Sequence, residues 1–277
     1  MKSKKLKKAE LNNDGNSWDM WRIPLFGRGI EEVLKRISSQ LTVTPCLPAG
    51  RSYELGKKPF WIATVNPEFM MAARKDAGFR VKLLKTDLNV MDGIGLIWAK
   101  QLLITNYELR IKKIYYGLKI GMEILLGKHK ENLVTGADLM DRMCQLAEVK
   151  NKTVYFYGGW GERAKKTAEY FVKKYPKLKV AGWRAEDFDF KTEADILFVA
   201  RGMKKQEEWI DQNGDKLKVK VVMGVGRSFD YYSGELKRAP GWMRKMGLEW
   251  LYSLLKEPKR WRRQLQLPRF VWVVLFN

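Results

Sequence analysis

A carboxylate follows a short apolar run at a position suited to ligand chemistry. Asp92 lies in the segment Met91-Asp92-Gly93-Ile94-Gly95, directly after a predicted strand, and the glycines let a ligand or backbone approach closely. A carboxylate held there can act as a general base on a sugar hydroxyl. An aspartate in front of a helix also serves as an N-cap without any catalytic role, so the local sequence leaves both interpretations open.

Polar side chains lie at the ends of two other predicted strands. Thr64 and Asn66 offer a hydroxyl and an amide suited to sugar or phosphate, although Asn before Pro is also a common turn starter. Gln206, followed by Glu207, offers an amide suited to a sugar or a uracil edge. Alternatively, Gln206 and Glu207 form the ordinary charged start of a helix and bind no ligand.

Two glycines and an aspartate complete the candidate set. Gly158 and Gly159 lie between a predicted strand and a helix, so their N–H groups suit a diphosphate, and a tight turn without ligand fits equally well. The segment is not GxGxxG, and the sequence has no P-loop motif. Asp230 lies in the last core loop, and the sequence allows three roles for it: capping a helix, pairing with an arginine or contacting a ligand.

The elements that position these residues alternate along the chain. We expect strands at 60–64, 87–91, 153–157, 179–183, 195–200 and 220–225, and helices at 67–85, 94–103 and 206–212. This alternation predicts an α/β fold, with a mostly parallel sheet and helices on both faces. Ligands bind beyond the carboxyl ends of such strands, which selects the loops at 64–66, 92–95, 158–161, 201–206 and 224–230.

The charge balance predicts a polyanionic partner. The 277 residues carry a formal net charge of +22, which suits nucleic acid, a lipid surface or a phosphorylated substrate. Cys46 and Cys144 give no disulfide framework, so a reducing cytoplasm is the default. The single histidine, His129, lies in a polar run, and we therefore expect no histidine-based metal site.

Three segments lie outside the alternating pattern. Residues 1–20 are rich in Lys, Asn, Asp and Gly and predict a disordered basic tail, and residues 43–59 predict a loop. Residues 104–131 hold an inserted amphipathic helix, either a second interfacial helix or one packed on the domain or on a partner subunit. Its apolar face comprises Ile111, Ile114, Tyr115, Leu118 and Met122.

Residues 236–277 predict an amphipathic, membrane-binding appendage. A wide apolar helical stripe lies between clusters of Lys and Arg, which suits an anionic lipid surface. No apolar run approaches the roughly 18–20 residues that span a bilayer, so we expect the protein to lie on a membrane. The side chains expected to enter the interface are Trp242, Met243, Met246, Trp250, Leu251, Leu254 and Trp261.

Taken in order, several segments resemble the WecG/TagA/CpsF family of bacterial glycosyltransferases. The segments are TVNPEFMMAARKD (64–76), TDLNVMDGIGLIWA (86–99), VTGADLM (134–140), VYFYGG (154–159), KKQEEW (204–209) and the long stretch 224–263. The resemblance runs from about residue 60 to 263 and is interrupted by 104–131. It implies a Rossmann-like catalytic domain over 21–235, followed by the helical appendage.

The resemblance also implies an activity. It implies an inverting, metal-independent hexosyltransferase that needs no cofactor and acts in cell-surface polysaccharide or teichoic-acid-type synthesis. The enzyme would move an N-acetylmannosamine-type sugar from a UDP donor to a polyprenyl-diphosphate-linked sugar. Such an enzyme would be peripheral on the cytoplasmic face of the bacterial membrane and would self-associate, without a nucleic-acid partner.

The resemblance implies roles for particular residues. Asp92 matches the family's proposed base. Arg260 and Arg263 match appendage arginines that reach over the pocket, where guanidinium groups can bind UDP phosphates. The other residues expected to bind substrate are Thr64, Asn66, Gly93, Gly158, Gly159, Gln206, Glu207 and Asp230.

The chain departs from the family pattern at or near this pocket. Leu133 and Ser253 stand where arginines are usual, and the other departures are Arg201, Met203, Lys204 and Arg227. Arg201 and Arg227 are new positive charges that could replace the missing arginines. The sequence leaves open whether these changes retune or abolish activity.

Two alternative functions remain at this stage. A degenerate homologue would bind nucleotide-sugar or lipid without turnover, which the pocket departures motivate. A basic nucleic-acid-binding protein would explain the charge of +22, but the sequence has no helix-turn-helix, zinc or RNP-type signature.

Overall fold

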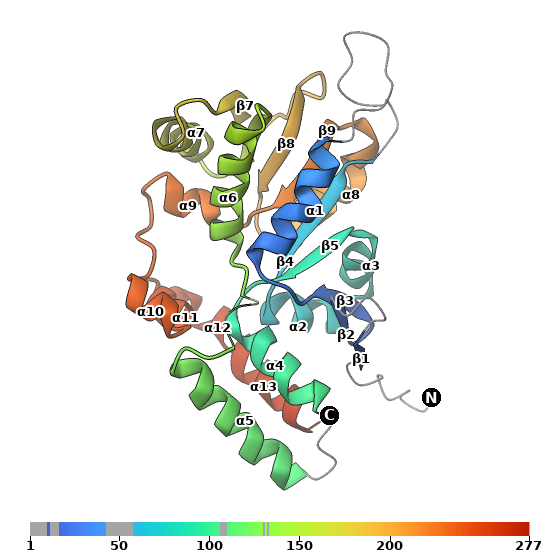
Figure 1. Cartoon of the computed structure of the whole chain (residues 1–277), viewed down its shortest axis with the longest axis vertical. Helices are drawn as coiled ribbons and strands as arrows, with labels where there is room; N and C mark the ends of the chain where they lie inside the picture. The colour runs from blue at the N-terminus through green and yellow to red at the C-terminus, as the bar shows by residue number, and fades with distance from the viewer. Residues whose placement is uncertain are drawn as a thin grey trace.

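One sheet organises the part of the chain that the structure describes. The computed structural model describes residues 10–11, 17–42, 58–105, 110–129, 131 and 133–276. Nine strands of these residues form the sheet, and a group of helices extends from one end of the molecule (Figure 1). The α/β class predicted from alternation is confirmed, whereas most of the predicted loop at 43–59 falls outside the described residues.

The sheet is parallel except at one edge. Its strand order is β1-β2-β3-β5-β4-β9-β8-β6-β7, in which only the β1–β2 and β2–β3 pairs are antiparallel. The strands are β1 (Glu10–Leu11), β2 (Ser17–Met20), β3 (Ile23–Phe26), β4 (Phe60–Val65), β5 (Leu88–Met91), β6 (Thr153–Gly158), β7 (Lys179–Arg184), β8 (Glu193–Ala200) and β9 (Lys218–Gly224).

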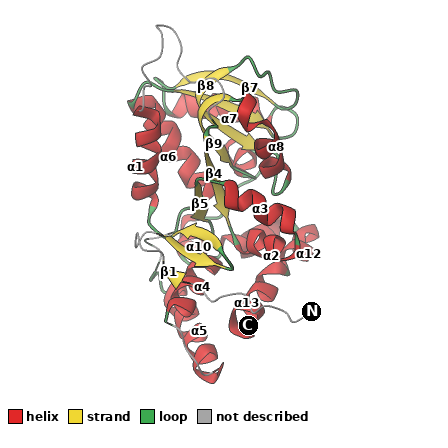
Figure 2. Cartoon of the chain, turned by 90° about the vertical axis from the view of Figure 1, so that its right-hand side faces the viewer, coloured by secondary structure: helices red, strands yellow, loops and turns green. Residues whose placement is uncertain are grey.

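Alternate side chains of a strand enter different helix layers. In β4, Ile62 joins the core formed with α1, α6 and α7, while Ala63 and Val65 join the core formed with α2, α3 and α4. Figure 2 shows α1 and α6 on one side of the sheet and α3 and α8 on the other. The helices are α1 (Ile30–Thr42), α2 (Pro67–Lys75), α3 (Ala77–Lys85), α4 (Ile94–Ile104), α6 (Gly136–Val149), α7 (Arg163–Lys174), α8 (Lys205–Asn213) and α9 (Ser228–Tyr232).

The helical stretch predicted over 67–85 is two helices. Asp76 lies between α2 and α3, and its side chain accepts a hydrogen bond from the Phe79 N–H at 3.0 Å. An aspartate in this position satisfies a free N–H group at the start of the second helix. Only Asp76 separates the two helices, so the interruption is too short for apolar spacing to reveal.

The predicted disordered tail is wrong for residues 17–20. These residues form β2, in which Trp18 and Met20 are fully buried, and the Trp18 Nε1–H donates to Met91 Sδ at 3.1 Å. The physical signal is the alternation of polar Ser17 and Asp19 with apolar Trp18 and Met20, a period-two strand pattern. The amino-acid composition averaged over residues 1–20 hides this alternation.

The inserted helix is α5 (Arg110–Leu125), and it packs by its opposite face. Gly117, Ile120 and Ile124 are buried against α4 and the C-terminal helices. The apolar face predicted from spacing is exposed, and Ile111, at 83%, is its most open member. The helix therefore has two apolar faces, of which this chain covers one.

The C-terminal appendage packs against the body of the protein. It consists of α10 (Gly241–Lys245), α11 (Glu249–Lys256), η2 (Pro258–Arg260), α12 (Trp261–Gln264) and α13 (Gln266–Phe276). Helix α13 lies against α2, α4 and α5 and buries Phe270 and Val274 completely or nearly so. Part of the apolar surface of the appendage, outside the predicted stripe, is thus protein core.

The side chains expected to face lipid differ in exposure. Trp242 and Trp261 are 61% and 52% exposed, and Met246 and Trp250 also reach the surface. Leu251 and Leu254 are half-buried. Met243 is buried, so it does not present itself at the surface as expected, because α10 turns that side chain towards the protein.

The buried Trp18 provides a test of the N-terminal strands. Trp18→Ala is expected to lower the free energy of unfolding by about 3–5 kcal/mol, since it leaves a cavity in the core. Trp183→Ala, the same change at a partly exposed tryptophan of β7, should cost about 1 kcal/mol or less. Denaturant unfolding of both variants measures the difference, and equal losses would contradict the burial of β2.

Candidate active site

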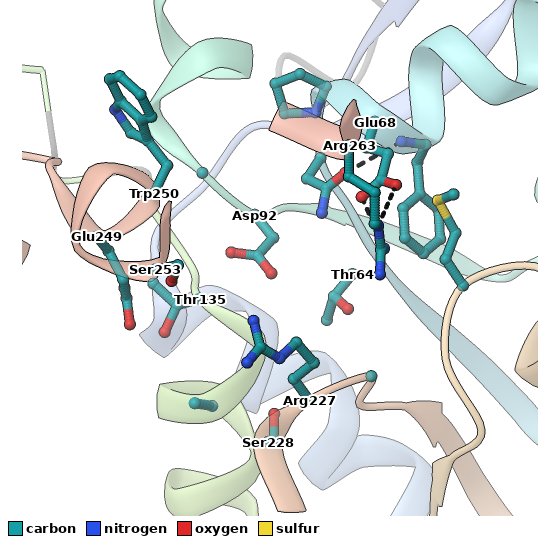
Figure 3. A pocket seen from close by; sticks show the side chains of 18 of the residues that line it. Thr64, Glu68, Asp92, Thr135, Arg227, Ser228, Glu249, Trp250, Ser253 and Arg263 are labelled. Carbon is teal, nitrogen blue, oxygen red and sulfur yellow. Dashed lines mark hydrogen bonds and ion pairs between the residues drawn. The ribbon is translucent and has the colours of Figure 1, made fainter. Parts of the chain in front are cut away.

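A cavity of about 330 Å³ lies beyond the carboxyl ends of β4, β5 and β9. The N-terminus of α6 forms one wall, and α11, α12 and the start of α13 form a roof, so the cavity lies between the sheet and the appendage. Figure 3 shows Asp92 pointing into this space between Thr64, Thr135, Ser253 and Arg227. The cavity therefore lies where the rule for parallel sheets predicts a ligand site.

Asp92 is placed by backbone bonds that leave its carboxylate turned into the cavity. Its N–H donates to the Val65 carbonyl at 2.7 Å, which joins the ends of β4 and β5. Helix α4 begins at Ile94 with Gly93 at the N-cap position, so the alternative role of Asp92 as the cap of that helix is not what the structure shows. Gly93 also lines the cavity, at φ +94°, a conformation that favours glycine.

The surroundings of Asp92 make its carboxyl a better base than an ordinary aspartate. Burial, followed by the negative charge of Glu249 on α11, raises the pKa of Asp92 from 3.8 to about 7. The N–H of Gly136, at the start of α6, donates to the carboxylate and opposes this shift. A pKa near neutrality suits a group that must accept a proton at physiological pH.

Three of the predicted pocket residues line the same cavity. Thr64 Oγ1 donates to the Gly224 carbonyl at 3.2 Å, which ties β4 to β9. Asn66 accepts the Phe69 N–H at 3.1 Å as the N-cap of α2, so the turn interpretation holds while the residue also borders the cavity. Gln206 is buried and accepts the Gly226 N–H at 3.0 Å.

Four predicted residues lie outside the cavity lining. Gly158 and Gly159 form a tight turn in which the Gly159 N–H donates to the Ala200 carbonyl at 2.7 Å, and a Cβ on Gly158 would lie 2.6 Å from that oxygen. Their conformation serves strand packing, as in the ligand-free alternative. Asp230 pairs with Arg163 at 2.8 Å.

Glu207 is the fourth residue outside the lining. It is fully buried, and its carboxylate accepts the Lys204 N–H at 2.7 Å and the Gln206 Nε2–H at 2.7 Å. Burial raises the pKa of Glu207 to about 7. The hydrogen bond between Glu207 and Gln206 thus fixes the orientation of the Gln206 side chain, which lines the cavity.

Guanidinium groups approach the cavity from separate elements. Arg263 of α12 makes a bidentate pair with Glu68 of α2, at 2.8 and 2.9 Å, as Figure 3 shows. Arg227, after β9, pairs with Glu257 of the appendage at 2.5 Å. Both arginines line the cavity, whereas for Arg260 only the backbone, in η2, is described.

Arg238 is a cavity residue that the sequence analysis missed. Its guanidinium binds Asp138 at 2.5 and 2.9 Å, Thr135 at 2.9 Å and Glu249 at 3.0 Å. These contacts join α6 to α11. Burial lowers the pKa of Arg238, but Asp138 and Glu249 together raise this pKa by more, so the guanidinium stays charged. In sequence Arg238 is one arginine in a basic stretch, and its partners Asp138 and Thr135 lie about a hundred residues away.

The departures from the family pattern separate into two groups. Met203, Arg227 and Ser253 line the cavity, so these changes alter its surface directly. The remaining departures lie outside it: Arg201 donates to the Tyr157 hydroxyl and covers that ring, Lys204 pairs with Asp76 at 2.8 Å, and Leu133 packs in the apolar core. Of the two new arginines, only Arg227 is therefore positioned to replace a lost one.

The described residues contain no cluster of three or more His, Cys, Asp or Glu side chains arranged to hold a metal ion. What they do assemble is one carboxylate of raised pKa in a cavity that three guanidinium groups also line, those of Arg227, Arg238 and Arg263. The carboxylate can take a proton from a hydroxyl, and the guanidiniums can stabilise negative charge on a leaving diphosphate.

The raised pKa of Asp92 predicts how stability depends on pH. A carboxyl that is neutral in the fold up to about pH 7, but ionised above about pH 4 when unfolded, makes the fold less stable as pH rises through that window. Asp92→Asn should therefore raise Tm at pH 8 by roughly 2–4 °C, the shift that about 1 kcal/mol produces at this size. The gain should disappear at pH 4 in thermal melts, and a gain independent of pH would contradict the shifted pKa.

The chain matches a known family over most of its length. The model of the Glycosyl transferase WecG/TagA/CpsF family matches residues 40–119 and 116–277, two segments that meet inside α5. This result favours the glycosyltransferase interpretation over the nucleic-acid one.

Individual relatives carry one shared name, N-acetylglucosaminyldiphosphoundecaprenol N-acetyl-beta-D-mannosaminyltransferase. The protein of Bacillus subtilis (strain 168) is 30% identical over 223 residues, which is 77% of this chain and 78% of the relative. That of Bacillus spizizenii (strain ATCC 23059 / NRRL B-14472 / W23) is 30% identical over 227 residues, 79% of each chain. That of Staphylococcus aureus (strain MRSA252) is 27% identical over 223 residues, 77% of this chain and 79% of the relative. The chain, with its cavity at the predicted strand ends, belongs to the WecG/TagA/CpsF family of glycosyltransferases.

Proposed function

We propose that this protein transfers an N-acetylmannosaminyl group from a UDP donor to N-acetylglucosamine carried on a polyprenyl diphosphate. The observation that carries the proposal is Asp92, whose pKa is raised to about 7 inside a cavity bordered by guanidinium groups. The names of the relatives supply the sugar and the acceptor class. The product would serve cell-surface polysaccharide or teichoic-acid-type synthesis.

The proposed reaction is a single displacement. The Asp92 carboxylate takes the proton of the acceptor hydroxyl while that oxygen forms a bond to the anomeric carbon of the donor sugar. The bond from this carbon to the diphosphate breaks, and UDP leaves with the electron pair, which inverts the configuration. Arg227, Arg238 and Arg263 stabilise the charge that develops on the diphosphate, so the reaction proceeds without metal or cofactor.

The appendage and α5 support a location on an anionic membrane at the cytoplasmic face. Trp242 and Trp261 expose most of their surface beside Arg and Lys side chains of the appendage. The exposed apolar face of α5 carries Ile111, Tyr115 and Leu118 beside Lys112 and Lys119. Such surfaces bind at the lipid interface. None of the described helices has the length and apolar content that crossing a bilayer requires.

The role of Asp92 is tested by its amide variant. Asp92→Asn should retain the fold and lose transfer to an N-acetylglucosaminyl-diphosphate acceptor by about 10²–10⁴-fold, the usual contribution of a general base. In the unchanged protein kcat/KM should rise with pH through about 7, as the carboxylate forms. Release of UDP measures both.

The control for this test is Asp211→Asn, the same chemical change at a surface ion pair with Lys85. It should leave the pH profile and the rate essentially unchanged. Full turnover in Asp92→Asn would remove Asp92 as the base. Binding of UDP-sugar by the unchanged protein without any UDP release would instead identify a non-catalytic homologue.

The membrane surface is tested by changing exposed tryptophans. Deleting 236–277 would uncover the core around Phe270, so we choose the double variant Trp242→Glu/Trp261→Glu. It should bind vesicles containing anionic lipid at least tenfold more weakly in sedimentation, since two apolar anchors become charged. Trp183→Glu, at the far edge of the sheet, is the control. Unchanged vesicle binding by the double variant would exclude these anchors.

A further inference from the structure

A second cavity adjoins the candidate active site. It is an apolar groove of about 560 Å³ between α11–α12 and α13. Trp250, Gln264 and Leu267 belong to the lining of both cavities, so the groove begins where the active-site cavity ends. Its other lining residues are Leu254, Trp261, Leu265, Pro268, Val271, Trp272 and Leu275.

The apolar lining of the groove favours a hydrocarbon ligand. Apart from Gln264 at the junction, the side chains that line it are aliphatic, aromatic or proline. A sugar or phosphate there would lose hydrogen bonds to water without replacement, which costs free energy. A branched hydrocarbon chain would instead remove apolar side chains from water, at about 25 cal/mol per Å² of buried surface.

The groove is backed by packed protein. Phe270 and Val274 lie on the reverse side of α13, buried against the body of the protein. At its far end, Leu275 contacts α5, where a Cβ on Gly117 would lie 3.3 Å from the Leu275 side chain. Glycine at that position lets α5 approach α13 closely and support the groove wall.

We propose that this groove binds the first isoprene units of the acceptor's polyprenyl chain. The proposal rests on the proposed function, which requires an acceptor whose sugar and diphosphate enter the active-site cavity. The diphosphate then lies near the junction, where Arg263 of α12 directly precedes the shared residue Gln264. Binding energy from the remote hydrocarbon helps to position the reacting sugar at Asp92.

A matched pair of variants tests the groove. Leu254→Trp fills it, whereas Leu255→Trp makes the same change at the next residue, which is 67% exposed and outside its lining. Both are assayed in detergent with two N-acetylglucosaminyl-diphosphate acceptors, one with a long polyprenyl chain and one with a short linear alkyl chain. The measured quantity is the ratio of kcat/KM for the long acceptor to that for the short one.

Leu254→Trp should lower this ratio about tenfold, which corresponds to 1.4 kcal/mol of lost discrimination. Leu255→Trp should keep the ratio of the unchanged protein. An unaltered ratio in Leu254→Trp, or no preference for the polyprenyl chain in the unchanged protein, would overturn the proposal. A detergent assay separates this effect from membrane binding, since no bilayer is present.

A binding measurement distinguishes failure of the groove from failure of the proposed function. A photoreactive isoprenyl diphosphate should crosslink the unchanged protein within 250–275, and Leu254→Trp should suppress that crosslink. Crosslinks elsewhere, or crosslinks that Leu254→Trp leaves unaltered, overturn the groove whether or not the protein transfers sugar. Absence of turnover with both acceptors, together with the expected crosslink, would reject the transferase activity and retain the groove.

Discussion

The arrangement of the site depends on arginine–carboxylate pairs that cross from the sheet domain to the appendage. Arg263 with Glu68 joins α12 to α2, and Arg227 with Glu257 joins the end of β9 to the chain after α11. Arg238 extends the same network to Asp138 of α6. The Arg227 and Arg238 pairs lie partly shielded from solvent, where attraction is stronger than on an open surface, whereas the Arg263–Glu68 pair is more exposed. They hold the roof of the cavity in a definite position.

The repeating pattern of the sheet made much of this architecture predictable. Asp92, Thr64 and Gln206 follow apolar runs, and parallel strands present their carboxyl ends at one edge, so local sequence was sufficient to bring them together. The same rule selected Gly158, but β6 lies nearer the far edge of the sheet, and its turn is closed by Ala200. A rule about strand ends does not specify which strands flank the cavity.

Other parts of the site depend on contacts between distant segments. Arg238 has no local pattern that distinguishes it from neighbouring basic residues, because its role arises from Asp138 on α6 and from Thr135, which caps that helix. The appendage shows a related difficulty. Its apolar stripe suggested a lipid-facing surface, yet Met243 of that stripe is covered by protein. Amphipathic spacing shows that a face must be covered, and it does not identify what covers it.

The negative charge of Glu249 couples the acid–base strength of Asp92 to the position of α11. Glu249 is held by Arg238, and its negative charge is one reason that the pKa of Asp92 is about 7. Moving α11 away would admit water and withdraw that charge, and Asp92 would return towards the weak basicity of an ordinary aspartate. An open appendage would thus leave the carboxylate ionised but a poor proton acceptor. The helix that roofs the cavity therefore also sets the proton affinity of Asp92, so this carboxylate is a strong proton acceptor only while the appendage is in place.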